Sequence, residues 1–154
     1  MWLYASSFFY YFFLPLGIDR ITKYMVTAQI IADQPITSFL QIYTTYNRGI
    51  SWGIGSSQHA VQFALLSFVV FLVMVIFCFH AYQVRRDVAL FRTCLVIVSG
   101  ALSNMYDRII FGGVIDFICF HVQCWSFPVF NVADIFIFCG VMLHIFYSMR
   151  HEHA

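Results

Sequence analysis

Four short patches hold most of the polar residues of an otherwise apolar sequence. Their motifs are Asp19-x-x-x-Lys23, Tyr46-Asn47-Arg48-Gly49, Asn104-x-x-Asp107-Arg108 continuing to Asp116, and Asn131-x-x-Asp134. A carboxylate inside a membrane costs on the order of several kcal/mol unless it is paired or neutral, so such acids usually have a function. Buried acids act as general acids and bases in hydrolysis or as proton relays in transporters. These patches are therefore the candidate functional residues.

Three of the patches contain pairs of polar residues at helical spacing. The pairs are Asp19 with Lys23, Asn104 with Asp107, and Asn131 with Asp134. Residues three or four positions apart lie on the same face of a helix, so the members of each pair are expected to project together. Arg108 is expected either to neutralise Asp107 or to bind backbone carbonyls.

The composition indicates an integral membrane protein. Of 154 residues, 62% are hydrophobic and 10% are charged, and the mean hydropathy is +0.82. Soluble domains carry roughly 25% charged residues. A formal net charge of +1 offers no field for binding nucleic acid, which is excluded as a partner. The length allows a single domain over residues 1–154.

Apolar stretches predict four transmembrane helices at about residues 2–26, 60–79, 88–106 and 129–147, because about 20 residues cross the hydrocarbon layer. On these bounds Asp134 lies about one and a half turns into the last span.

Basic residues predict the orientation of these spans. Arg85 and Arg86 follow the second span, Arg92 lies near the start of the third, and Arg150 follows the fourth. This connection and both termini are therefore expected in the cytoplasm. The acidic residues of the patches then gather near the outer face of the membrane.

The two outer connections differ in character. Residues 28–58 contain aromatic and β-branched residues in partial alternation, which favours a few short strands over an irregular loop. Residues 111–130 are aromatic and begin with Gly112-Gly113, and we expect them to lie in the membrane interface. The predicted fold class is therefore an all-α membrane protein with a small β element: four transmembrane helices, a short extracytoplasmic sheet and a flap loop.

Cysteine and histidine spacing predicts neither a metal ion nor a cofactor. The five cysteines include no CxxC motif, although Cys119 and Cys124 could pair in an oxidising compartment. The histidines considered as ligands are scattered along the sequence: His59, His80, His121 and His144.

The ordered motifs resemble those of bacterial lipoprotein signal peptidase, signal peptidase II. The resemblance spans about residues 14–148 and rests on Asp19 to Lys23, the turn Asn47-Arg48-Gly49, SGALSNMYDR with VIDF after it, and FNVAD before an apolar helix. It implies an aspartic endopeptidase of the bacterial inner membrane, with Asp116 and Asp134 as the catalytic dyad. Supporting roles fall on Asp19, Lys23, Asn47, Asn104, Arg108 and Asn131, to which we add Asp107 as the neighbour of Arg108.

The resemblance also implies the substrate and partners. Such an enzyme removes the signal peptide from diacylglyceryl-modified prolipoproteins, cutting before the lipidated cysteine, and its partners are these substrates and membrane lipids. We expect a monomer. The sequence departs from the family pattern at Ser103, where glycine is common, and at Trp52, where phenylalanine is common. These changes bear on substrate preference and helix packing.

Two other functions stay open at this point. A proton-coupled transporter would use the same acids as a relay, but it needs polar residues along a whole span, and residues 60–79 hold only Gln62 and Ser67. An inactive homologue that acts as a membrane assembly partner would use its aromatic faces for packing.

Overall fold

The computed structural model describes residues 2–31, 33–49, 60–122 and 125–152. An N-terminal helical segment consists of α1 (Trp2–Phe8), a π-helical stretch η1 (Phe9–Phe13) and α2 (Leu14–Thr27). Three further helices are α3 (Ala60–Gln83), α4 (Val88–Phe111) and α5 (Val132–Glu152). The strands are β1 (Gln34–Pro35), β2 (Leu40–Asn47), β3 (Val114–Val122) and β4 (Trp125–Ser126).

The helices agree with the predicted spans. By length and composition, α3, α4 and residues Val132–Arg150 of α5 can each cross a membrane. The segment predicted at 2–26 is helical from residue 2 to 27, interrupted by η1. Local signals explain the ends of α4: Asp87 accepts hydrogen bonds from the amides of Ala89 and Leu90 at its start, and Gly112 adopts a left-handed φ of 67° at its end.

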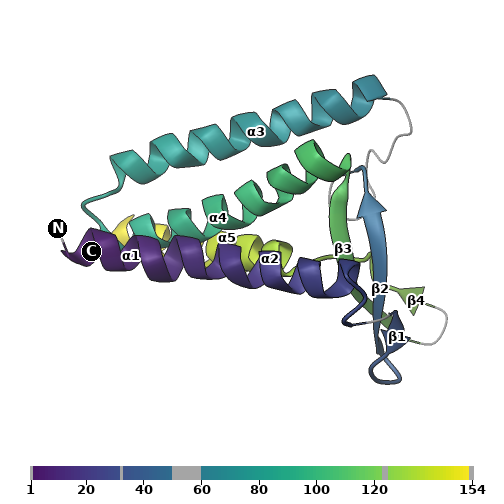
Figure 1. Cartoon of the computed structure of the whole chain (residues 1–154). Coiled ribbons are helices and arrows are strands. Elements are labelled where there is room, and N and C mark those ends of the chain that lie inside the picture. Colours follow the sequence, from purple (N-terminus) through teal and green to yellow (C-terminus); the bar gives the residue numbers. More distant parts are fainter. Residues whose placement is uncertain (1, 32, 50–59, 123–124, 153–154) are drawn as a thin grey trace.

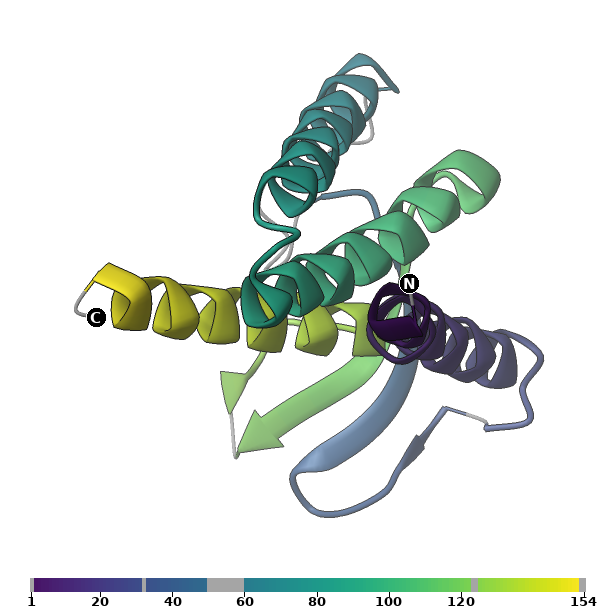
Figure 2. The same cartoon turned by 90° about the vertical axis from the view of Figure 1, so that its left-hand side faces the viewer.

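Helix α4 is the central helix of the bundle. It packs against α3, against α5 and against the N-terminal segment, and it lies between α3 and the α1–α2 segment (Figures 1 and 2). Two glycines permit the close crossing of α4 and α5. A Cβ atom on Gly100 would lie 2.7 Å from the carbonyl oxygen of Ala133, and one on Gly140 would lie 2.7 Å from Cγ1 of Ile97.

A four-stranded antiparallel sheet of order β1-β2-β3-β4 stands at one end of the helices, and both chain termini lie at the other (Figure 1). The strands expected in residues 28–58 are β1 and β2. The sequence did not predict that residues 114–122 form the partner strand, although their β-branched and aromatic residues suit one. In this register Thr45 pairs with Asp116, and an irregularity separates Ile42 from Thr45. Cys119 is a free thiol in the structure, which contradicts the possible disulfide with Cys124; Cys124 itself lies outside the described residues.

Candidate active site

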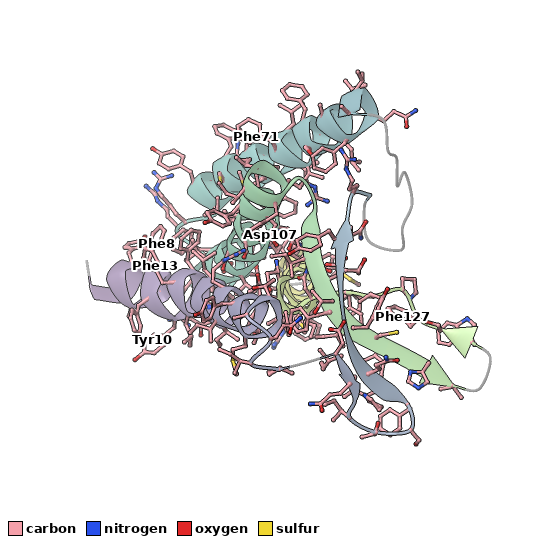
Figure 3. All side chains as sticks on the ribbon, turned by 45° about the vertical axis from the view of Figure 1, so that its right-hand side comes forward. Phe8, Tyr10, Phe13, Phe71, Asp107 and Phe127 are labelled. Atoms are coloured by element: carbon pink, nitrogen blue, oxygen red, sulfur yellow. The ribbon has the colours of Figure 1, made fainter. Side chains whose placement is uncertain are left out.

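The four polar patches meet where the helices abut the sheet. Asp19 and Lys23 come from α2, Asn47 from β2, Asn104, Asp107 and Arg108 from α4, Asp116 from β3, and Asn131 and Asp134 from the start of α5. Seven of these nine residues are buried: Asp19, Lys23, Asn104, Asp107, Arg108, Asp116 and Asn131. Figure 3 shows Asp107 among the helices near the sheet. The structure therefore brings these nine predicted residues together.

Lys23 is the centre of a buried ion-pair cluster. Its Nζ lies 2.9 Å from Oδ2 of Asp19 and 2.7 Å from Oδ2 of Asp107, and it donates a hydrogen bond of 2.8 Å to Oδ1 of Asn104. Arg20 donates to the other oxygen of Asp107. Two cations thus balance two buried carboxylates, as a low-dielectric interior requires.

Asp19 also fixes the beginning of α5. Its Oδ1 accepts a hydrogen bond of 2.7 Å from the amide of Ala133, while its Oδ2 accepts one of 2.5 Å from the hydroxyl of Ser103. A carboxylate at a helix N-terminus satisfies free amides and complements the helix dipole. An acid of α2 therefore holds the end of a helix far along the chain.

Asn131 and Asp134 form a reciprocal cap on α5. Oδ1 of Asn131 accepts from the amide of Asp134 at 3.0 Å, and Oδ2 of Asp134 accepts from the amide of Asn131 at 3.3 Å. The expectation that Asp134 lies one and a half turns into the span is wrong: it is the third residue of α5. The helix begins late because Phe130 is extended and forms a bridge with Ile118 of β3.

A chain of side-chain amides connects Asp116 with Asp134. Oδ1 of Asp116 accepts a hydrogen bond of 2.6 Å from Asn131, whose amide nitrogen also donates to Oδ1 of Asn104 at 3.1 Å. Asn104 in turn donates to Oδ1 of Asp134 at 2.9 Å. The second oxygen of Asp116 accepts from Asn47 at 2.9 Å. Both acids are thus oriented by asparagine side chains.

The environment of Asp116 favours its protonated form. Burial raises the pKa of this carboxyl, and the nearby charge of Asp134 raises it further, whereas the hydrogen bonds from Asn47 and Asn131 lower it; the resulting pKa is about 7. An ordinary aspartate has a pKa of about 3.9. Near neutral pH, Asp116 can therefore either hold or release a proton.

Arg108 binds backbone carbonyls rather than Asp107. Its guanidinium donates to the carbonyl oxygen of Gly49 at 3.0 Å and to that of Asn104 at 3.3 Å. Asp107 is already paired with Lys23 and Arg20. Arg108 thus ties α4 to the turn that follows β2.

Two contributors to the site were not predicted. Arg20 is adjacent to Asp19, yet it pairs with an acid of α4 and lies over the ring of Tyr106, 4.6 Å from the ring centroid. Ser103 was noted as a departure from the family pattern, but its bond to Asp19 was not foreseen. Trp52 lies outside the described residues. Contacts between distant helices leave no spacing signal in the sequence.

Two of the histidines that are scattered along the sequence come together in the fold. Nε2 of His80 and Nε2 of His144 lie 3.0 Å apart, because α3 and α5 both pass beside α4 at the end remote from the sheet. His59 lies outside the described residues, and His121 is in β3.

Fold and site define a class: a helical membrane protein with a carboxylate and amide cluster buried at one end of its helices. Residues 11–150 match the family model described as Signal peptidase (SPase) II. The chain is 33% identical over 141 residues to the lipoprotein signal peptidase of Anaplasma phagocytophilum (strain HZ), an alignment that covers 88% of this chain and 86% of that protein. It is also 34% identical over 149 residues to the lipoprotein signal peptidase of Brucella ovis. That alignment covers 90% of this chain and 89% of the relative. The chain therefore belongs to the signal peptidase II family, a family of peptidases of the bacterial inner membrane.

Solved structures share the fold. A bacterial membrane enzyme determined by the in meso method at 2.3 Å superposes with a TM-score of 0.74 over 95% of this chain and 88% of its own. A second, at 1.9 Å, superposes with a TM-score of 0.71 over 94% of this chain and 92% of its own. Both are 24% identical in sequence to this chain. They support the assignment of the fold.

Proposed function

We propose that this protein is an intramembrane aspartic endopeptidase with Asp116 and Asp134 as its catalytic pair. The observation that carries the proposal is the amide chain through Asn131 and Asn104, which holds the two acids in one electrostatically coupled site. Its substrates are diacylglyceryl-modified prolipoproteins, cut before the lipidated cysteine. The names of the relatives support this substrate class.

The pair hydrolyses an amide by sharing one proton. The ionised carboxylate removes a proton from water as the water oxygen attacks the scissile carbonyl carbon, and the protonated carboxyl gives its proton to the carbonyl oxygen. When the tetrahedral intermediate collapses, the C–N bond breaks and the leaving nitrogen takes up a proton from the pair. The titration belongs to both acids together, so neither is assigned the proton in the resting state.

The other residues of the site position these two acids. Asn47 and Asn131 hold the carboxyl of Asp116, and Asn104 holds that of Asp134. The remaining supporting residues keep α2, α4, α5 and the sheet together: Asp19, Lys23, Asp107 and Arg108. The asparagine amides do not change protonation state in the reaction, so Asp116 and Asp134 are the groups that carry the transferred proton.

We also propose that the site lies near the outer face of the membrane. The sheet and the acids are at one end of the helices, whereas both termini and the arginine-containing turn between α3 and α4 are at the other (Figure 1). Arginine-rich connections face the cytoplasm. A monomer with both termini in the cytoplasm then presents its acids to a signal peptide that arrives laterally through the lipid.

The test is cleavage of a lipid-modified precursor by the variants Asp116→Asn and Asp134→Asn in detergent or vesicles. Each change should lower turnover by about 10²–10⁴-fold, the range expected for a lost general acid or base. Asp33→Asn is the matched control, because Asp33 is exposed and its carboxylate accepts hydrogen bonds from Thr44, away from the acid cluster. Near-normal cleavage by either dyad variant would contradict the proposal. Proton flux through vesicles from a wild-type protein that cleaves nothing would favour a transporter instead.

A further inference from the structure

A second cluster of chemically reactive side chains lies at the end of the helices remote from the sheet. It consists of His80 from the last turn of α3, Cys94 from α4 and His144 from α5. The donor atoms of these three residues all lie within 4.8 Å of one another. In the part of the chain that the structure describes, this is the one such group of three or more His, Cys, Asp or Glu residues.

The two imidazoles already stand close to the separation of metal ligands. Nε2 of His80 and Nε2 of His144 are 3.0 Å apart. Two nitrogens bound to one tetrahedral Zn²⁺ at about 2.0–2.1 Å lie about 3.3 Å from each other. The distance between the two nitrogens therefore has to change by only tenths of an ångström, and the rings have to turn so that both lone pairs meet at the ion.

The remaining nitrogen of His144 is fixed by a threonine. The hydroxyl of Thr93 donates to the carbonyl oxygen of Leu90 at 2.8 Å, so its oxygen is left to accept from Nδ1 of His144, also at 2.8 Å. This hydrogen bond places the proton on Nδ1 and directs the lone pair of Nε2 toward His80. Ligating histidines are characteristically oriented by a hydrogen bond of this kind.

A thiol and an acid complete the surroundings. Cys94 is fully buried, and its Sγ lies 3.7 Å from Nδ1 of His144. The carboxylate of Asp87, at the N-terminus of α4, acts electrostatically on His144, and its sign favours a bound cation. Two imidazoles and one thiolate form a ligand set typical of Zn²⁺.

The geometry points to a zinc-type divalent metal site formed by His80, His144 and Cys94. On binding, the proton that His80 shares with His144 moves to Nδ1 of His80, and the Cys94 thiol releases one proton to solvent. A water molecule supplies the fourth ligand. The ion would fasten α3 to α4 and α5, and this role is independent of the peptidase proposal.

The test uses the full-length protein purified in detergent and treated with chelator, with Co²⁺ as the spectroscopic probe. We expect one saturable equivalent of Co²⁺, the visible bands of a tetrahedral site and a thiolate-to-metal charge-transfer band. His80→Gln and His144→Gln should each weaken binding at least tenfold, and Cys94→Ser should remove the charge-transfer band. Zn²⁺ should compete with Co²⁺ and raise the Tm of the wild-type protein but not of the histidine variants.

Matched controls separate this site from adventitious binding. His121→Gln and Cys139→Ser alter the same residue types elsewhere, and a double variant, His151→Gln with His153→Gln, removes two histidines near the C-terminus. All three should bind like wild type. The inference is overturned if Co²⁺ binding is absent or unsaturable, if no charge-transfer band forms, or if binding survives both His80→Gln and His144→Gln. The Tm of each variant without metal shows whether it has folded.

Discussion

Helices α3 and α4 are equally long, at 24 residues each, yet they occupy opposite environments. None of the most apolar stretch of α3 is buried inside the protein, whereas 56% of that of α4 is. Helix α3 contains no Asp, Glu, Lys or Arg, while α4 contains Arg92, Asp107 and Arg108. The more apolar helix is therefore the peripheral one, and the more polar helix is the core.

The physical reason is that lipid is as apolar as leucine. Burying an apolar side chain against another helix gains little over leaving it in lipid, so helices associate through small and polar residues. The packed face of α4 contains Ser99, Gly100 and Ser103, which are all buried. On α3, by contrast, Ile76 is 64% exposed. In this protein, polar and small residues mark the protein-facing side of a helix.

The largest effect is expected from removing the positive charge of Lys23, which pairs with Asp107 on the polar face of α4. Lys23→Met leaves Asp19 and Asp107 without their shared partner and should lower the free energy of unfolding by about 3–5 kcal/mol. Unfolding by denaturant in detergent micelles measures it. Arg86→Met, at an exposed position in the turn before α4, is the control and should change stability by less than about 0.5 kcal/mol. Equal effects of the two variants would contradict a structural role for the ion pairs.

Measuring stability as a function of pH sharpens the contrast between the two regions, because the polar cluster contains the titratable Asp116 whereas α3 contains no acidic residue. The pKa of Asp116 is about 7 in the folded protein and about 3.9 when unfolded. Between these values the folded protein binds more protons, so stability should fall as pH rises from about 4 to 7, by up to about 1.4 kcal/mol per unit. Asp116→Asn removes this contribution, and its stability relative to wild type should increase with pH over that window. Parallel profiles of the two proteins would show that Asp116 has an ordinary pKa.

Glycine substitutions test how closely α4 packs. Gly100→Ala would place a Cβ 2.7 Å from the carbonyl oxygen of Ala133, which cannot move without shifting α5, so we expect a loss of about 1–3 kcal/mol. Gly17→Ala in α2 is the matched control, because among the described residues no atom beyond the neighbouring helix backbone lies within 4 Å of the added Cβ. There the gain in helix propensity should stabilise the protein by about 0.5–1 kcal/mol. Thermal unfolding of both variants measures these changes in stability. An unchanged stability of Gly100→Ala would show that α4 and α5 can move apart to accommodate the added methyl group.

The smallest effect is expected on α3. Ile76→Ala removes a large side chain that faces lipid, and its loss should change the unfolding free energy by less than about 0.5 kcal/mol, whereas a buried Ile→Ala change costs about 2–5 kcal/mol. The same denaturant titration applies. A cost above 2 kcal/mol would mean that α3 packs against another surface, such as a second copy of the chain.

The sequence predicted the helices well, because an apolar stretch long enough to cross the hydrocarbon layer is directly visible in the hydropathy of the sequence. It also predicted which polar residues gather, since each stands out against apolar neighbours. It could not predict their partners. The pairing of Arg20 with Asp107, the cap that Asp19 provides to Ala133 and the approach of His80 to His144 depend on how helices cross, and crossing is set by packing at small residues such as Gly100.

The start of α5 was misplaced for a related reason. Apolar residues before Val132 look helical, yet Phe130 is drawn into a bridge with Ile118 of β3. A tertiary contact here outweighed the local pattern. The consequence is that Asp134 lies in a capping position rather than within the helix.

The hydrogen bond that the amide of Ala133 donates to Asp19 connects α2 directly to the first turn of α5, so a movement of one is transmitted to the other. The tilt of a membrane-crossing helix responds to the thickness of the surrounding bilayer. A bilayer that tilts the N-terminal helix would therefore displace Asp134 with it, and cleavage rates in thinner and thicker vesicles would record that displacement.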